Sequence, residues 1–379
     1  MEYKLEDIFD LQMGKTPSRS NPEYWNSNDH KWISIGDLSR CGKYIEDTKE
    51  YLSDKAVEES GISIIPAGTV VMSFKLSIGK TAIIPEPMYS NEAIMSFRDK
   101  HVIDILPDYT YYMLSSRDWD TGTNKAVMGK TLNKATLSKI KVKVHGIAEQ
   151  KEIVRVLDKL NAVIEARQME IQKLEDLIKA RFVEMFRNMN PSWPTVSIGD
   201  ICTDARTGPF GSALHHDEFV NDGIFVLGID NAVENRFSFN RMRYITEEKY
   251  QQLKRYTVYP GDVIITIMGT VGRSAVIPND MPLAINTKHL ACLTPDYAKV
   301  DSIFLCSAFQ MHPDVQRQLN SNTKGAIMDG LNLGIIKGLE FQLPPLQKQK
   351  DFEFFYSQVD KSKCDALNIT SAPHYLLAS

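Results

Sequence analysis

The chain has 379 residues, a net charge of −4 and an isoelectric point of about 6.1. This balance argues against a protein that coats nucleic acid by bulk electrostatics, although basic loops on an acidic body can still read DNA. No run of 18 apolar residues occurs, the N-terminus lacks a signal-peptide pattern, and the five cysteines form no C-x-x-C pair. We therefore expect a cytoplasmic protein with free thiols.

The sequence contains an internal repeat of domain size. Gly68, in Ile-Pro-Ala-Gly-Thr-Val-Val, corresponds to Gly261, in Tyr-Pro-Gly-Asp-Val-Ile-Ile, at an offset of 193 positions, and the same offset relates Lys80 to Arg273. Other pairs, at an offset of 193 or 199, are Asp7 with Asp200, Asp37 with Asp230, Leu132 with Leu331 and Gln150 with Gln349. A duplicated unit of this length is a whole domain. Two similar domains suggest a molecule that grips two similar objects.

Each repeat is predicted to be a mixed α/β domain with long Gly-, Pro- and Ser-rich loops. β-branched runs bounded by turn residues predict the strands. The expected strands are residues 4–11, 62–74 and 81–84 in the first repeat, and 194–202, 258–267 and 274–277 in the second. Short helices are expected at residues 107–116 and 300–312, because a Pro or Asp signal precedes each.

A long helix is predicted between the repeats, at residues 147–190. This stretch contains neither Gly nor Pro, and Pro191 follows directly after it. Apolar residues recur in it at alternating steps of four and three, which is typical of a coiled-coil seam. The seam residues are Ile153, Leu157, Leu160, Ile164, Ile171, Leu174, Ile178 and Met185, with Arg167 and Arg181 at two further seam positions. At ~1.5 Å per residue such a helix is roughly 64 Å long.

A second, shorter helix is expected at residues 346–368, followed by a tail at 369–379. It repeats the start of the first helix, but Pro373 and the polar residues before it limit its length. The short helix can pair with only part of the long one. The remainder of the apolar seam should therefore need another partner.

Catalytic motifs are incomplete throughout the sequence. The Gly-Lys-Thr triplets at residues 14–16, 79–81 and 129–131 lack the glycine that a phosphate-binding loop requires five positions earlier. The S-x-x-K tetrad at residues 77–80 has no S-D-N or K-T-G partner. His215-His216 lacks further ligands at metal spacing, and E-x-K at 247–249 lacks a Pro-Asp partner. We expect no catalytic residue and no metal site.

Nucleic-acid binding is the better-supported prediction. Cations, hydroxyls and aromatic residues gather in loops at similar places of both repeats, where they can contact phosphate or base edges. The candidate DNA-binding residues are Lys15, Thr16, Ser18, Arg19, Lys75, Ser77, Lys80, Lys125, Lys130, Phe210, Ser212, Thr270, Arg273, Lys288 and Lys324. Any one of them can equally be a solvated turn residue. Lys80 and Arg273 are the strongest pair, because a cation recurs at one position of a duplicated unit.

Four short motifs, in this tandem order, resemble the DNA-specificity subunits of type I restriction–modification systems. They are Gly-Lys-Thr-Pro-Ser-Arg at 14–19, Trp-Ile-Ser-Ile-Gly-Asp at 32–37, Gly-Pro-Phe-Gly-Ser at 208–212, and Pro-Pro-Leu at 344–346 before Gln349. The resemblance covers almost the whole chain. It implies an α+β protein in which two target-recognition domains, residues 1–146 and 191–345, are joined by helices that form an antiparallel coiled coil.

The resemblance also implies a function. Each domain would read one half of a bipartite site on double-stranded DNA, and the helices would dock the modification (methyltransferase) subunits. Restriction subunits would then join the complex. The chain itself would bind no cofactor, because S-adenosylmethionine, ATP and Mg belong to the partner subunits. It would be a non-catalytic subunit that directs a DNA adenine methyltransferase and endonuclease.

The short second helix departs from the family pattern. Self-association with a second copy of the chain is one way to complete the coiled coil. Two functions of other classes stay open on the sequence: a fused methyltransferase or nuclease, and a coiled-coil scaffold with two adaptor domains for protein partners. Salt-dependent binding to a split DNA site distinguishes a specificity subunit from the scaffold.

Overall fold

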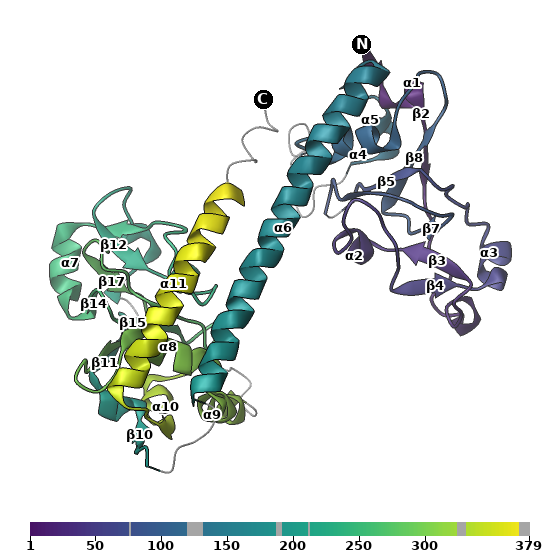
Figure 1. Cartoon of the computed structure of the whole chain (residues 1–379). Coiled ribbons are helices and arrows are strands. Elements are labelled where there is room, and N and C mark those ends of the chain that lie inside the picture. The colour runs from purple at the N-terminus through teal and green to yellow at the C-terminus, as the bar shows by residue number, and fades with distance from the viewer. Residues whose placement is uncertain (76, 120–131, 187–191, 211–212, 324–330, 371–379) are drawn as a thin grey trace. The chain divides into compact units, whose positions relative to one another are not determined.

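The computed structural model describes residues 1–75, 77–119, 132–186, 192–210, 213–323 and 331–370 (Figure 1). The described chain divides into two compact units, residues 1–166 and 167–370. The division falls inside the long helix α6 (Ile147–Phe186), so each unit is a mixed α/β domain that carries part of this helix. No described helix has both the length and the apolar character that crossing a membrane requires.

The first unit contains three antiparallel or mixed sheets. They have the strand orders β2-β8-β5-β6, β4-β3-β7 and β1-β9, and only the β3–β7 pair is parallel. The strands are β1 (Glu2–Lys4), β2 (Phe9–Met13), β3 (His30–Ile33), β4 (Glu50–Leu52), β5 (Val70–Ser73), β6 (Thr81–Ile83), β7 (Tyr89–Ser90), β8 (Ile94–Asp99) and β9 (Lys141–Lys143). The helices are α1 (Leu5–Ile8), α2 (Ile35–Leu38), α3 (Asp54–Ser60), α4 (Pro107–Ser115) and α5 (Lys134–Ser138).

The second unit repeats this topology. Its sheets have the orders β11-β18-β15-β16, β13-β12-β17-β14 and β10-β19. The strands are β10 (Thr195–Ser197), β11 (Cys202–Thr207), β12 (Ile224–Leu227), β13 (Tyr244–Ile245), β14 (Thr257–Val258), β15 (Val263–Thr266), β16 (Ser274–Val276), β17 (Ala284–Asn286), β18 (Leu290–Pro295) and β19 (Glu340–Gln342). The helices are α7 (Glu247–Leu253), α8 (Ser302–Met311), α9 (Pro313–Thr323), α10 (Leu333–Lys337) and α11 (Leu346–Thr370).

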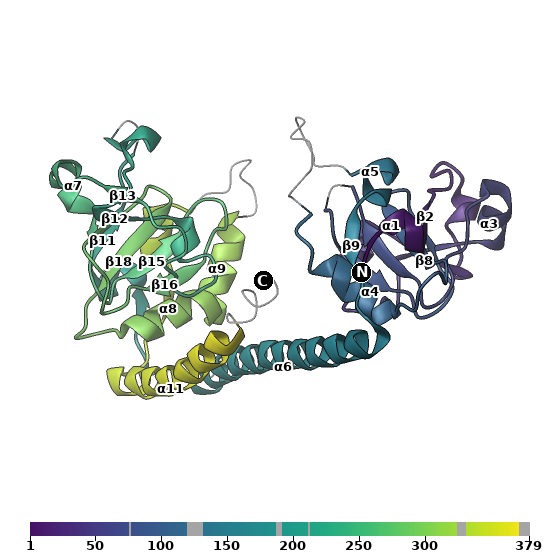
Figure 2. The same cartoon turned by 90° about the horizontal axis from the view of Figure 1, so that it is seen from above.

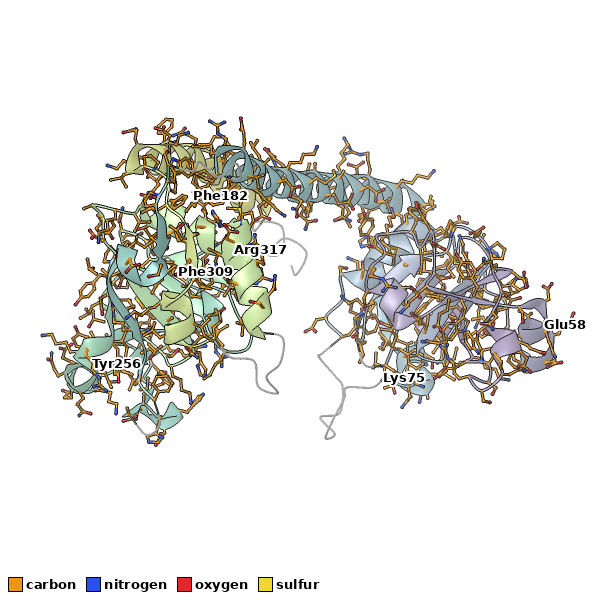
Figure 3. All side chains as sticks on the ribbon, turned by 90° about the horizontal axis from the view of Figure 1, so that it is seen from below. Glu58, Lys75, Phe182, Tyr256, Phe309 and Arg317 are labelled. Atoms are coloured by element: carbon orange, nitrogen blue, oxygen red, sulfur yellow. The ribbon has the colours of Figure 1, made fainter. Side chains whose placement is uncertain are left out.

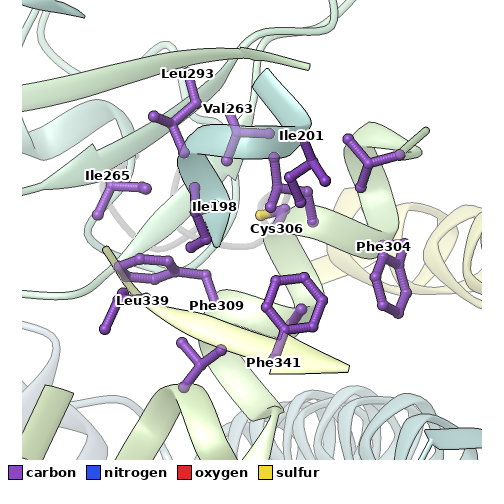
Figure 4. Close-up of a cluster of buried hydrophobic side chains, with 14 of the residues drawn as sticks. Ile198, Ile201, Val263, Ile265, Leu293, Phe304, Cys306, Phe309, Leu339 and Phe341 are labelled. Atoms are coloured by element: carbon purple, nitrogen blue, oxygen red, sulfur yellow. The ribbon is translucent and has the colours of Figure 1, made fainter. Parts of the chain in front are cut away.

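Each unit has its own apolar core, which lies between the helices and the sheet that contains β5 in the first unit or β15 in the second. In the second unit, Val263, Ile265 and Leu293 project from the sheet towards Phe304 and Phe309 of α8 (Figure 4). In the first unit, the equivalent core joins the strand β5 and β8 side chains to Tyr109 and Leu114 of α4. The predicted helices at 107–116 and 300–312 are thus confirmed to within two residues at each end.

Two predicted strands are wrong as single elements. Residues 4–11 divide into β1, the short helix α1 and β2, and residues 194–202 divide in the same way around a 3-10 turn at Ile198–Ile201. The cause is a capping carboxylate: Asp7 accepts a hydrogen bond from the Lys4 N–H at 2.9 Å, and Asp200 accepts one from the Ser197 N–H at 3.0 Å. Such a side chain satisfies the free N–H at a helix start.

The predicted strands 62–74 and 258–267 are each interrupted by a tight turn. Only Val70–Ser73 and Val263–Thr266 form the long strand, and Thr257–Val258 is a separate short one. Gly68 and Gly261 have φ angles of 78° and 84°, a left-handed conformation that glycine adopts without a steric penalty. The predictions were too long because β-branched residues occur on both sides of the turn that each glycine forms.

Within the second unit, the helix α11 packs antiparallel against the C-terminal part of α6 (Figure 2). The Phe352 ring lies 5.3 Å from that of Phe182, and further along α11 Lys363 pairs with Glu175 at 3.0 Å. The antiparallel pairing is therefore confirmed. α11 runs to Thr370, two residues beyond the expected end, whereas residues 187–190 of the expected first helix lie outside the described chain.

The seam residues of α6 have several neighbours. Ile153 packs on the core of the first unit, while Leu174, Ile178 and Met185 join the core of the second. The other predicted seam residues, Leu157, Leu160, Ile164 and Ile171, are half-buried. Sequence reasoning missed Phe182 and Phe186, which are almost fully buried in the second unit; Figure 3 labels Phe182. The available signal was the spacing of four residues from Ile178 to Phe182 and again from Phe182 to Phe186.

Candidate nucleic-acid interface

The two strand-to-strand loops after β5 and β15 are bonded in the same way. In the first unit the Ser73 hydroxyl donates to the Ser77 carbonyl and accepts from the Lys80 N–H at 3.1 Å. In the second unit the Thr266 hydroxyl donates to the Thr270 carbonyl and accepts from the Arg273 N–H at 2.9 Å. These hydrogen bonds give the two loops the same conformation.

A glycine completes each loop and places a cation at its end. Gly79 and Gly272 have φ angles of 89° and 84°, and each donates its N–H at 2.9 Å to the carbonyl of the hydroxyl-bearing residue. The next residue is Lys80 in one unit and Arg273 in the other, and both are exposed. In the part of the chain that the structure describes, neither side-chain cation has a hydrogen bond or an ion pair. Both cations are available to a ligand.

The loops just described join the strands of two hairpins, β5–β6 and β15–β16. A second loop in each unit lies against another strand, β7 in the first unit and β17 in the second. A Cβ on Gly14 would lie 2.1 Å from the Ser90 carbonyl oxygen, and one on Gly208 would lie 2.2 Å from the Thr287 carbonyl carbon. Only glycine permits so close an approach of two backbone segments. The adjoining Lys15 N–H also donates to the Ser90 carbonyl at 2.8 Å. The loops that begin at Gly14 and Gly208 are therefore fixed next to β7 and β17.

Arg19 is bound within the first unit. Its guanidinium makes a two-point contact with the Glu50 carboxylate, the second hydrogen bond measuring 3.1 Å, and lies 3.8 Å from the centre of the Trp25 ring. The hydrogen bond with Glu50 is the main cause that raises the pKa of Arg19. This geometry uses the donor edge of the guanidinium for Glu50 and one of its faces for Trp25. Arg19 therefore orders the loop and has little capacity left for DNA.

The neighbouring predicted residues are partly engaged. The Lys15 ammonium donates to the Ser60 carbonyl, and the Ser18 hydroxyl bonds to that of Ser20 at 2.8 Å. Thr16 donates to the exposed carboxylate of Glu92. This bond is the first cause that lowers the pKa of Glu92, and the charge of Lys75 adds to it. Thr16, Lys75 and Glu92 therefore form one polar group, and Figure 3 shows Lys75 at the surface.

The second unit carries different chemistry at the corresponding places. Phe210 and Met268 are 54% and 40% exposed, and Lys288, in the turn after β17, is exposed as well. The Ile267 N–H donates to the His289 carbonyl at 2.9 Å, which holds the Met268 and Lys288 turns together. Burial lowers the pKa of His289, and the charges of Lys288 and Arg243 lower it further. This corner of the molecule is apolar and cationic.

The duplicated fold makes these two groups direct counterparts. Aligned through the loops, Thr16 corresponds to Phe210, Lys75 to Met268, and Glu92 to Lys288. The sequence interpretation missed Glu92 and Met268, which become visible once the repeat alignment is carried residue by residue through both loops. Of the other predicted residues, Ser77 and Thr270 contribute backbone carbonyls to the hairpins, while Lys125, Lys130, Ser212 and Lys324 lie outside the described residues.

The chain belongs to the family described as the type I restriction modification DNA specificity domain, which matches residues 1–176 and 190–369. It is 27% identical over 192 residues to the MjaIX specificity subunit of Methanocaldococcus jannaschii, covering 50% of this chain and 44% of that protein. It is 28% identical over 209 residues to the EcoR124I/EcoR124II specificity subunit of Escherichia coli, covering 51% and 49%. The chain thus spans about half the length of these relatives.

Solved structures show the same fold. The S subunit of a type I restriction–modification system from M. genitalium superposes with a TM-score of 0.57 at 13% identity, covering 100% of this chain and 94% of that one. A chain from a structure on complex assembly and conformational transition of the type I R-M system gives 0.54 at 14% identity, with the same coverage. The two-domain architecture with long helices is therefore that of known S subunits.

Proposed function

We propose that this chain is the DNA-specificity subunit of a type I restriction–modification complex, and that each unit reads one half of a bipartite site. The observation that carries the proposal is the duplicated hairpin that presents Lys80 in one unit and Arg273 in the other. A free cation held on a rigid turn is suited to a phosphate or to guanine O6 and N7. Its recurrence at one position of two like domains is expected of two similar readers.

The two half-sites should differ in sequence. The group of Thr16, Lys75 and Glu92 offers hydrogen-bond donors and acceptors, which discriminate bases in the major groove. Phe210 and Met268 instead offer apolar contact, which suits a thymine methyl group or a partly unstacked base step. The difference in chemistry at equivalent positions supports an asymmetric bipartite site.

The proposal assigns catalysis and cofactors to other subunits. Modification subunits would bind S-adenosylmethionine and dock on the helices, and restriction subunits would supply the ATP- and Mg-dependent activity. The loops that present cations in both units, those after β5 and β15, are suited to contacts with DNA.

DNA binding by the complex of this chain with its modification subunit tests the proposal. We expect binding to a split site to weaken steeply with salt. Replacing Lys80 or Arg273 with alanine should reduce the slope of log K against log salt by about one if the side chain contacts phosphate. A base contact should instead give a loss of ~1–3 kcal/mol that is confined to one base pair.

A matched control is Lys254→Ala, which removes an exposed lysine from the 3-10 turn that follows α7. It should leave affinity and salt dependence unchanged. A complex that binds split and scrambled sites equally, with a shallow salt dependence, would instead favour a scaffold for protein partners.

A further inference from the structure

Lys43 connects the first domain to the helix that follows it. It lies in the loop after α2, it is only 16% exposed, and its ammonium is 2.6 Å from both Asp108 of α4 and Asp158 of α6. Asp158 also accepts from the Tyr112 hydroxyl at 2.5 Å, and Asn161 donates to that hydroxyl at 3.1 Å. One lysine therefore links a loop of the domain, a domain helix and the spacer helix.

Arg236 makes the corresponding connection in the second unit. It lies in the loop after β12, and its guanidinium donates to the Cys364 sulfur of α11 at 2.7 Å. Asp360, one turn earlier on α11, faces the same guanidinium. Burial lowers the pKa of Arg236, but Asp360 and Cys364 outweigh burial and raise it. The adjoining Asn235 carbonyl accepts from Gln310 of α8 at 3.3 Å.

Polar contacts hold this second connection more than close packing does. Two cavities, of about 440 and 370 Å³, are both lined by Asn235, Arg236, Gln310 and Tyr356. Side chains around this loop are therefore less closely packed than in a core, so polar contacts contribute more to holding the loop on the helix. The Asp360 Oδ1 atom is buried and has no hydrogen-bond partner in the described chain, and the charge of Asp360 is the first of the causes that raise the pKa of Arg236.

Lys43 and Arg236 are counterparts in the duplicated sequence. They are separated by the same 193 positions that relate Lys80 to Arg273, and each reaches the helix that directly follows its own domain. A cation at one repeat position, bonded to the next helix in both units, indicates a shared mechanical role. Neither side chain is on the hairpin loops.

We propose that Lys43 and Arg236 are positioning residues that fix each recognition domain on its following helix and so help to set the spacer between the two half-sites. The inference rests on the proposed function. If a domain can rock on its helix, its hairpin reaches a wider range of positions along the DNA. The bases read in each half should stay the same, while the tolerated spacer length should broaden.

Binding to a library of DNA sites with constant half-sites and variable spacers tests this role in the complex with the modification subunit. The variants are Lys43→Met and Arg236→Met, which keep the aliphatic stem and remove the charge. We expect each to reduce discrimination between the preferred spacer and spacers one base pair longer or shorter by about tenfold. Lys43→Arg and Arg236→Lys should restore most of that discrimination.

Several outcomes decide the matter. Unchanged spacer preference in folded Met variants would overturn the proposal, and so would loss of base preference within a half-site, because that means direct reading. If Lys43→Met does not fold, the milder Asp158→Asn removes one partner of the same contact and is judged by the same criterion. If the wild-type complex prefers no split site, the proposed function itself fails, which is distinct from failure of the positioning role.

Discussion

The hydroxyl groups of Ser73 and Thr266 occupy equivalent places in the two units and make the same pair of hydrogen bonds. Each donates to a carbonyl four residues later and accepts from the N–H of the cation seven residues later. Either residue can evidently form this loop, so the requirement is for a hydroxyl and not for a particular side chain. The loop positions Lys80 and Arg273, and its stability should control what they can bind.

Removing either hydroxyl should destabilise its loop. Ser73→Ala and Thr266→Val remove two hydrogen bonds within the loop, which should lower the free energy of unfolding by ~0.5–1.5 kcal/mol. DNA affinity should fall as well, because the cation is no longer held. The exchanges Ser73→Thr and Thr266→Ser are the matched controls and should bind normally. Affinity is measured by titration of labelled DNA. If the Ala and Val variants bind DNA as tightly as the wild type, the hydroxyl is not needed for DNA binding.

Exchanging one loop group for its counterpart should change only one half-site. The triple variant Phe210→Thr, Met268→Lys, Lys288→Glu gives the second unit the polar chemistry of the first. We expect altered base preference in the second unit's half-site, with the other half-site unchanged as the internal control. Selection of bound sites from a randomised DNA pool measures this. Changes spread over both halves would contradict separate reading by each unit.

Gln349 should be essential for the start of α11. It is fully buried, accepts from the Asp301 N–H at 2.9 Å and donates to the Lys299 and Pro344 carbonyls. Gln349→Leu leaves these groups unpaired and should lower the free energy of unfolding by about 1–3 kcal/mol in denaturant titration. Gln347→Leu, two residues earlier and exposed, is the control and should have little effect. Equal stability of the two variants would show that the Gln349 contacts are dispensable.

His312 should make the second unit less stable in mild acid. It is 4% exposed, its Nδ1 accepts from the Asp314 N–H at 3.3 Å, and burial lowers its pKa below 6.5. The unfolded chain then binds the proton more readily, so the stabilisation is present above about pH 6.5 and is lost as pH falls towards the folded pKa.

Denaturant titrations at about pH 7.5 and pH 5.5 measure the effect of His312, because this interval spans the ordinary histidine pKa. The loss of stability between them should be smaller in His312→Gln, which cannot titrate. The exposed His101→Gln should behave as wild type. An identical pH dependence in His312→Gln would mean that other groups cause the acid sensitivity.

The sequence was sufficient for features that depend on local pattern. The repeat and the long helix α6 follow from spacing and residue type. Two kinds of feature were not predictable. The break between β1 and β2 depends on one capping carboxylate, Asp7, and the engagement of Arg19 depends on Glu50, which is 31 residues away in the sequence. Long-range partners of this kind appear only after folding.

The candidate site shows the same limit. Lys80 and Arg273 were predicted because the repeat doubles the signal for one position. Glu92 and Met268 were missed because neither belongs to a recognisable motif. Glu92 meets Thr16 only through the pairing of distant strands, and Met268 stands out only as the counterpart of Lys75. Lys43 and Arg236 share the repeat offset, but their role depends on contacts with α6 and α11 that periodicity does not show.

Mapping of methylated adenine by long-read sequencing addresses the proposed function directly. A host without restriction–modification systems of its own would express this chain together with its modification subunit. We expect one split motif, with a methylated adenine in each half and a fixed spacer between them. Absence of methylation, when the modification subunit is folded, binds S-adenosylmethionine and co-purifies with this chain, would contradict the specificity-subunit assignment.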